Sequence, residues 1–184
     1  MRLFYCVELA PDVQTQLDRI VQPLRAGAGR VSWVRPENFH FTLKFLGEIE
    51  PSAVEALTAL GAQIAPMFPQ FEITFDMAGA FPNAHRPRVL WIGCRQAPQV
   101  IFAVQEQLEK ELTKMGFEAE RNFSPHVTVG RVKEERRVGQ FAQIISQIKP
   151  FACRAQIAGL TLMESRLSPG GAIYAPVARW EFAP

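Results

Sequence analysis

The feature that most constrains this chain is a short motif that occurs twice. Residues 38–45 read Asn-Phe-His-Phe-Thr-Leu-Lys-Phe, and residues 124–131 read Ser-Pro-His-Val-Thr-Val-Gly-Arg. In each run a histidine and a threonine stand two places apart, among residues that favour β-strands. His40 and His126 are 86 residues apart, which is close to half of the 184-residue chain. The repeat predicts two similar lobes, each of which supplies one such strand.

Composition alone does not explain the repeat. The chain has three histidines and seven threonines, so a threonine two places after a given histidine is expected about 4% of the time. Two such pairs among three histidines arise by accident on the order of once in two hundred sequences. The third histidine, His85, stands alone in a proline-flanked loop, and we assign it no role.

Hydrophobic patterning predicts an α+β fold with largely antiparallel sheets, because several predicted strands follow one another through short turns. The predicted strands are rich in Val, Ile, Phe and Trp, and they are Arg2–Leu9, Val31–Val34, His40–Phe45, Phe71–Phe81, Arg88–Cys94, His126–Val132, Cys153–Met163 and Ala172–Trp180. Apolar residues at helical spacing predict helices over Pro11–Arg25, Pro51–Ile64, Pro98–Met115 and about Arg137–Ile148. No low-complexity linker interrupts residues 1–184, so we expect a single domain made of two interleaved lobes.

Charge and composition limit the class of partner. The net charge is +2, from 20 basic and 18 acidic residues. This balance argues against a protein that coats long stretches of nucleic acid, but it permits one that binds a single phosphate or a strand end. The apolar opening of the chain is too short for a membrane span. The three cysteines, Cys6, Cys94 and Cys153, are an odd number and lie far apart in the sequence, so a disulfide framework is not expected. Free cysteines are typical of a protein in the reducing cytoplasm. We therefore expect a cytoplasmic protein, monomeric and without a membrane partner.

The spacing within each motif suits chemistry on a phosphodiester. Side chains at i and i+2 of a strand point to the same face, so each strand presents an imidazole beside a hydroxyl. Threonine hydroxyls can donate hydrogen bonds to the non-bridging oxygens, while His40 and His126 reach the attacking and leaving oxygens. Two imidazoles with an ordinary pKa of about 6.5 predict a bell-shaped pH profile centred at about pH 6–8.

Metal catalysis is the main chemical alternative. A catalytic zinc site usually needs three protein ligands, and two histidines on separate strands lack an evident third. Aspartate is scarce, with Asp12, Asp18 and Asp76 all distant from both motifs in sequence. No glycine-rich phosphate loop, serine nucleophile elbow or dinucleotide fingerprint occurs either. The sequence therefore predicts no metal and no cofactor.

Longer runs around both motifs resemble the RNA 2′,3′-cyclic phosphodiesterases, also called 2′-5′ RNA ligases, of the two-histidine phosphoesterase superfamily. The resemblance spans nearly the whole chain and rests on residues 2–4, 33–47, 87–91, 124–131, 162–165 and 170–174. It implies a bilobal fold in which two largely antiparallel sheets line a central cleft, with helices on the outside. It also implies hydrolysis of an RNA 2′,3′-cyclic phosphate to a 2′-phosphate.

The resemblance further implies roles for particular residues. His40 would protonate the departing O3′ as proton donor, and His126 would act as proton acceptor for water. Thr42 and Thr128 would hold the phosphate.

Phe45 and Arg131, each five places after its histidine, match positions that contact the nucleobase. Strict alternation would turn an i+5 side chain away from the cleft, so a strand end or bulge must intervene, and Gly130 is a plausible place for one.

Two alternatives to this hydrolase stay open. A catalytically silent protein of the same fold could bind RNA ends without turnover. The same chemistry could also act on another cyclic phosphate, such as that of ADP-ribose, because the motifs define the phosphate and not what is attached to it. RNA ligation by the reverse reaction is chemically allowed as well, since the two histidines would exchange proton roles.

Overall fold

The computed structural model describes residues 1–26, 29–120, 122–135, 139–168 and 171–184. The strands are β1 (Arg2–Glu8), β2 (Gly29–Trp33), β3 (His40–Glu48), β4 (Phe71–Phe75), β5 (Met77–Phe81), β6 (Val89–Gly93), β7 (His126–Glu135), β8 (Cys153–Ile157), β9 (Gly159–Ser168) and β10 (Gly171–Glu181). The α-helices are α1 (Pro11–Arg25), α2 (Val54–Ile64), α3 (Gln99–Lys114) and α4 (Gln140–Gln147). Short 3₁₀ turns cover Pro36–Asn38, Pro51–Ala53 and Ala65–Met67.

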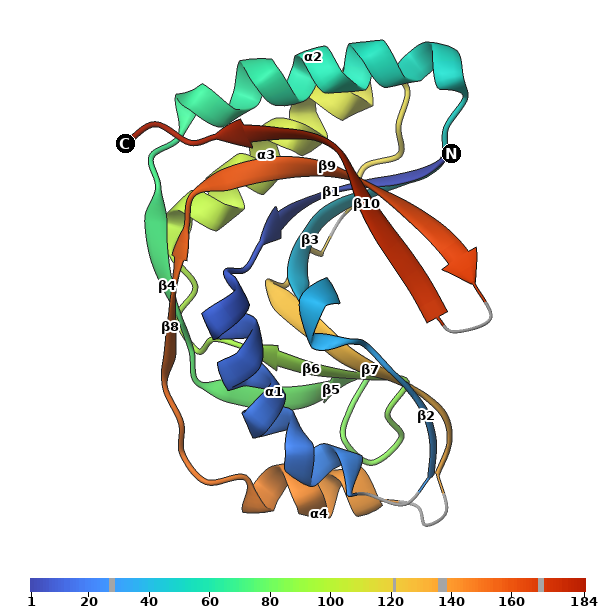
Figure 1. Cartoon of the computed structure of the whole chain (residues 1–184), viewed down its shortest axis with the longest axis vertical. Helices are drawn as coiled ribbons and strands as arrows, with labels where there is room; N and C mark the ends of the chain where they lie inside the picture. The colour runs from blue at the N-terminus through green and yellow to red at the C-terminus, as the bar shows by residue number, and fades with distance from the viewer. Residues whose placement is uncertain (27–28, 121, 136–138, 169–170) are drawn as a thin grey trace.

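The strands form one large and one small antiparallel sheet, as the α+β prediction required. The large sheet has the order β10-β9-β1-β3-β7-β6-β5, and β2 also pairs with β7. The small sheet pairs β4 with β8. In Figure 1, β10, β9, β1 and β3 form the upper half of the large sheet, and β7, β6, β5 and β2 form the lower half. Helices α2 and α3 cover the upper half, and α4 closes the lower end.

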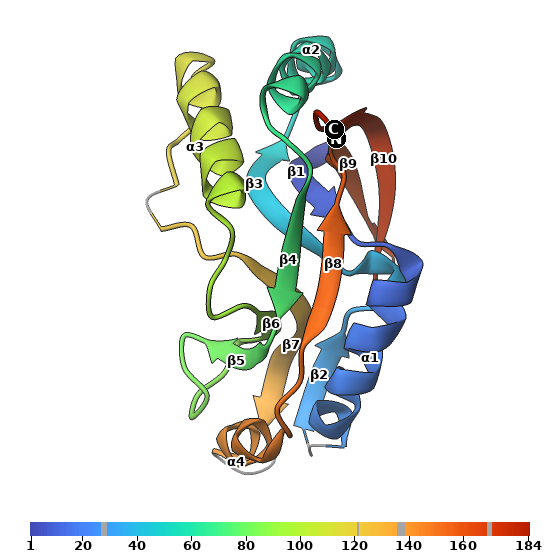
Figure 2. The same ribbon diagram turned by 90° about the vertical axis from the view of Figure 1, so that its left-hand side faces the viewer.

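The same order of elements occurs twice along the chain. β1-α1-β3-α2-β4-β5 is followed by β6-α3-β7-α4-β8-β9, with β2 added in the first half and β10 at the end of the second. The halves meet where β3 pairs with β7 through Phe41 and Val127. They are also joined by the ribbon of β4 and β8, which run side by side in Figure 2.

Two strand predictions were wrong because each merged two strands into one. The predicted strand Phe71–Phe81 is broken at Asp76, and the predicted strand Cys153–Met163 is broken at Ala158. At each break the chain leaves the small sheet and enters the large one. The Asp76 carboxylate accepts a hydrogen bond from the backbone N–H of Arg95 at 2.8 Å, which fixes the first crossing.

Other boundaries differ by less. The predicted strands that contain the motifs extend further, to Glu48 and Glu135. The first three residues of the predicted helix Pro51–Ile64 form a 3₁₀ turn before α2 begins at Val54. The predicted helix Arg137–Ile148 corresponds to α4, and its residues 137 and 138 lie outside the described residues.

The buried apolar side chains form a core that runs through both halves. Helix α1 buries the stripe of residues that its periodicity predicted, which includes Val13, Leu17, Val21 and Leu24. On the motif strands the odd positions Phe41 and Leu43, and likewise Val127 and Val129, are buried. The opposite face of these strands is therefore left for polar side chains. Among the described residues, no helix is long and apolar enough to cross a membrane.

Candidate active site

The two motif strands lie next to each other in the middle of the large sheet. Because Phe41 pairs with Val127 in antiparallel register, the residues on either side of this pair come from both motifs. A hollow of about 30 Å³ opens above them. Its lining includes every site residue predicted from the sequence, namely His40, Thr42, Phe45, His126, Thr128 and Arg131, together with Val34 and Tyr174.

A bulge in β3 explains how Phe45 reaches the same face as His40. In the pairing with β1, Tyr5 is opposite Lys44 and Cys6 is opposite Thr42, so Leu43 is an extra residue. The extra residue shifts the alternation of side chains by one. Leu43 and Lys44 are consequently both buried, and Phe45 is 54% exposed in the cleft.

Strand β7 has the same device at the equivalent place, which confirms the bulge expected near Gly130. Against β6, Leu90 is opposite Gly130 and Trp91 is opposite Thr128, so Val129 is the extra residue. Arg131 therefore returns to the face of His126 and Thr128. Gly130 faces Trp33 across the strand pair, and a Cβ at Gly130 would lie 2.8 Å from the Trp33 ring. Any larger residue would clash there.

Backbone carbonyls orient both imidazoles in the same way. His40 Nδ1 lies 2.7 Å from the carbonyl oxygen of Asn38, and His126 Nδ1 lies 2.7 Å from that of Ser124. A carbonyl can only accept, so each Nδ1 carries a proton and each neutral ring keeps its lone pair on Nε2. His40 Nε2 lies 3.1 Å from Thr42 Oγ1, whose hydroxyl donates to it.

Burial makes both histidines weak bases. The pKa of His40 is lowered to about 4, mainly by removal from water. The Asn38 carbonyl and Glu8 oppose this shift, and the charges of His126 and Arg131 add to it. The His40 ring stacks on Phe4 at 5.0 Å.

The pKa of His126 is also lowered, first by burial and then by the charge of Arg131. At neutral pH both rings are therefore uncharged, and each Nε2 is ready to accept a proton. One ring must gain a proton before it can act as an acid, and a bound phosphate anion favours that gain.

A larger hollow of about 400 Å³ continues from the smaller one. It shares Thr42, Phe45, His126, Thr128 and Arg131 with the smaller hollow and adds Phe81, Val89, Glu120, Asn122, Phe123 and Ser124. Three phenylalanines thus share the lining of this hollow with the two motif threonines and the His126 imidazole. This size and this mixture of aromatic and polar walls suit a small ligand such as a nucleotide.

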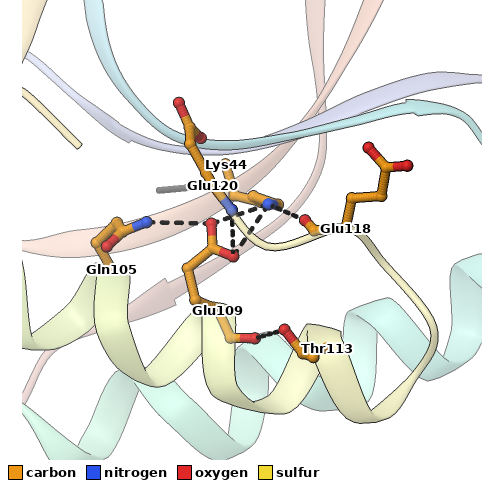
Figure 3. A network of polar contacts seen from close by, with 6 residues as sticks. All are labelled: Lys44, Gln105, Glu109, Thr113, Glu118 and Glu120. Carbon is orange, nitrogen blue, oxygen red and sulfur yellow. Dashed lines mark hydrogen bonds and ion pairs between the residues drawn. The ribbon is translucent and has the colours of Figure 1, made fainter. Parts of the chain in front are cut away.

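A buried ion pair holds one wall of the larger hollow in place. Lys44, which follows the bulge in β3, is 5% exposed and its Nζ lies 2.9 Å from Oε1 of Glu109 on α3. The same ammonium donates to the Glu118 carbonyl at 2.6 Å, and the Glu109 carboxylate accepts from the Glu120 N–H at 3.1 Å. Figure 3 shows Lys44 and Glu109 between α3 and the 118–120 segment. This segment ends at Glu120, which lines the larger hollow together with Asn122.

Sequence reasoning missed the aromatic surroundings of the histidines. Tyr174 meets the His40 ring edge-on at 5.2 Å, and Phe81 meets the His126 ring edge-on at 5.0 Å. Tyr174 lies in a run that carried the family resemblance, but nothing in that run indicated a contact with His40. No signal in the sequence pointed to Phe81.

The described residues contain no group of three or more His, Cys, Asp or Glu side chains that could hold a metal ion. His85 is exposed on the β5–β6 loop and lines neither hollow of the cleft. The smaller hollow itself presents the imidazoles of His40 and His126, the hydroxyls of Thr42 and Thr128, the Arg131 guanidinium and the Tyr174 side chain.

Comparison with known proteins points to one family. The sequence model of the family described as LigT like Phosphoesterase matches residues 7–91 and again 92–174. The RNA 2′,3′-cyclic phosphodiesterase of Methanothermobacter thermautotrophicus is 34% identical, over 95% of each chain. Its counterpart in Escherichia coli is 30% identical, over 97% of this chain and 95% of the relative.

Solved structures agree with the sequence relatives. The crystal structure of E. coli LigT complexed with 3′-AMP has a TM-score of 0.80 and 29% identity, covering 100% of this chain and 98% of that one. The crystal structure of TT0787 of Thermus thermophilus has a TM-score of 0.84 and 27% identity, covering 99% and 98%. The likeness therefore extends over the whole of each structure.

Proposed function

This chain belongs to the LigT-like phosphoesterase family, and from that premise we propose that it hydrolyses RNA 2′,3′-cyclic phosphate ends to 2′-phosphomonoesters. We propose that His40 and His126 do so as an acid–base pair without a metal. The observation that carries the proposal is that two similarly oriented imidazoles and two threonine hydroxyls line one small hollow. The relatives named RNA 2′,3′-cyclic phosphodiesterase supply the substrate class.

In the proposed reaction the cyclic phosphate lies between the two motif strands. In this bound state His40 is protonated at Nε2, so the Thr42 hydroxyl no longer donates to that atom. The hydroxyls of Thr42 and Thr128 then donate hydrogen bonds to the non-bridging oxygens of the phosphate. His126 Nε2 takes a proton from water as the water oxygen forms a bond to phosphorus. The P–O3′ bond breaks, its electron pair stays on O3′, and His40 Nε2 donates its proton there. The product carries a 2′-phosphate and a free 3′-hydroxyl. The assignment of acid and base follows the family resemblance.

The nucleobase of the terminal nucleotide is proposed to occupy the larger hollow. Phe45 offers an exposed aromatic face there, and Phe81 and Phe123 lie on the same lining. The Arg131 guanidinium borders both hollows, so it can stack on a base and attract the phosphate at once.

We further propose that residues 1–184 act as one domain of two similar interleaved lobes, as a monomer in the cytoplasm. The continuous core and the β4–β8 ribbon support a single cooperative unit. RNA ligation fits the same site, because an RNA 5′-hydroxyl could take the place of water in the attack on phosphorus and form a 2′-5′ linkage.

The test is turnover of a 2′,3′-cyclic mononucleotide, with the position of the product phosphate assigned by NMR. His40→Ala and His126→Ala should each reduce turnover by about 10²–10⁴-fold, while His85→Ala, the matched control, should not. Activity should also survive EDTA. Loss of activity on chelation that one added metal restores would overturn the metal-free mechanism.

Binding without turnover by the unmodified protein would favour the silent RNA-end binder. The substrate is tested by comparing the rates of turnover of a panel of cyclic phosphates that includes ADP-ribose cyclic phosphate. Faster turnover of that compound than of any RNA end would overturn the proposal that RNA is the substrate.

A further inference from the structure

A basic groove lies beside the catalytic cleft, outside the chemistry proposed above. Its volume is about 520 Å³, and it is lined by Arg86, Pro87, Arg88, Val89, Arg131, Val132, Lys133 and Glu134. Val89 and Arg131 also line the larger hollow of the cleft. The groove therefore continues directly from the space proposed for the terminal nucleotide.

Backbone hydrogen bonds fix the segments that carry the cations. In the loop between β5 and β6, the Asn83 Oδ1 accepts from the N–H groups of His85 and Arg86, each at 3.1 Å. The Arg88 N–H donates to the Phe81 carbonyl at 2.7 Å.

The Arg88 carbonyl accepts from the Val132 N–H at 3.0 Å. This last bond ties the β5–β6 loop to β7, so the arginines of the loop and the cations of β7 face one another across a defined groove.

The groove concentrates positive charge. Four of its eight lining residues are Arg or Lys and one is acidic, whereas the whole chain has a net charge of only +2. All four cations are exposed, and among the described residues none of them forms an ion pair. Neighbouring cations that repel one another without partners favour a polyanionic ligand at this place.

We propose that this groove binds the sugar–phosphate backbone of the RNA strand on the 5′ side of the terminal cyclic nucleotide. The inference rests on the proposed function, because the strand leaves the terminal ribose through its 5′ oxygen and needs a path out of the cleft. Arginine binds phosphate oxygens in bidentate geometry. An acidic peptide would also meet the charge requirement, but the continuity with the catalytic hollow through Arg131 favours the strand.

The experiment compares two substrates that share the same reactive end. One is a 2′,3′-cyclic mononucleotide, and the other is a six-nucleotide RNA that ends in that cyclic nucleotide. The Arg86→Gln/Arg88→Gln protein should lose about tenfold in kcat/KM on the hexamer, with turnover of the mononucleotide retained. Its slope of log(kcat/KM) against log[salt] on the hexamer should be less steep by about 1.4, from two lost phosphate contacts on a single strand.

The control removes two positive charges from the side of the molecule near β8. Lys149 and Arg154 are both exposed and line neither the groove nor the cleft. Lys149→Gln/Arg154→Gln should leave the kcat/KM of both substrates as in the unmodified protein. A loss on the hexamer equal to that of the groove variant would show an effect of net charge alone and overturn the proposal.

Other outcomes would also test the proposal. Equal losses of kcat/KM on both substrates would show that the arginines act on the reactive end, and unchanged hexamer kinetics would show that no strand lies in the groove. Either result would refute RNA binding in the groove, while the proposed function would stand. If the unmodified protein turns over neither substrate, the proposed function fails instead. Hexamer turnover inhibited by a poly-glutamate peptide in the unmodified protein but not in the groove variant, with an unchanged salt slope, would assign the groove to acidic peptides.

Discussion

The burial of His40 predicts that the folded protein loses stability in acid. In the folded state its pKa is lowered to about 4, mainly by removal from water, whereas the unfolded chain has the ordinary value of 6.5. Between about pH 6.5 and pH 4, His40 is therefore mostly protonated in the unfolded chain and mostly neutral in the folded protein. The contribution of neutral His40 to stability is fully present above pH 6.5 and is lost as the pH falls toward 4.

The size of this loss follows from the two pKa values. A difference of one pKa unit corresponds to about 1.36 kcal/mol, so His40 alone lowers the free energy of unfolding by about 2 kcal/mol between pH 7.5 and pH 5. This is a large fraction of the roughly 5–15 kcal/mol that stabilises a typical domain.

The assay is urea denaturation of the unmodified protein and of His40→Gln at both pH values. Other groups titrate in the same range, so the measured quantity is the difference between the two proteins in how much stability each loses. The unmodified protein should lose about 2 kcal/mol more than His40→Gln. His85→Gln removes a histidine from an exposed loop and is the matched control. Equal acid losses in all three proteins would refute the inference that His40 is held neutral by burial.

Three further predictions concern the cleft. Lys44→Met and Glu109→Leu should each lower the free energy of unfolding by about 3–5 kcal/mol, because each leaves a buried charge without its partner; the double variant should lose less than the sum, measured by the same denaturation. The profile of kcat/KM should peak below pH 6.5, because burial lowers the pKa of both histidines in the free protein. The profile of kcat should peak at a higher pH, because a bound phosphate anion raises the pKa of both histidines. Coincident optima near pH 7 would contradict this prediction. Arg131→Ala should raise KM for the cyclic mononucleotide with kcat little changed, since the contact is made in both the ground and transition states; an unchanged KM would place Arg131 outside substrate binding.

The sequence predicted the chemical core of the site because the relevant information is local. His40 and Thr42 share a face by strand periodicity alone, and so do His126 and Thr128. Even the bulge near Gly130 could be inferred, because Arg131 had to reach the same face as His126. The same argument applied to Phe45, but no glycine lies between His40 and Phe45, so nothing in the sequence marked Leu43 as the position of the bulge.

The features that sequence reasoning missed depend on contacts between distant segments. The breaks at Asp76 and Ala158 separate strands of two sheets, and apolar alternation continues across both because each side is partly buried. The pH range predicted from ordinary histidine pKa values did not include the burial of His40, because that burial involves Phe4 and Tyr174, which lie on other strands.

The pairing of Phe41 with Val127 gives the cleft the geometry of a dimer fused into one polypeptide. A half-length chain would carry one motif histidine, and two copies related by a twofold axis through this pair would together carry two. Fusion removes the requirement that the copies be identical. Phe45 and Arg131 occupy equivalent positions after equivalent bulges, yet one is aromatic and the other cationic. Under the proposed function, a nearly symmetric cyclic phosphate would therefore meet an asymmetric set of side chains, and this asymmetry would allow O3′ to be distinguished from O2′ as the leaving oxygen.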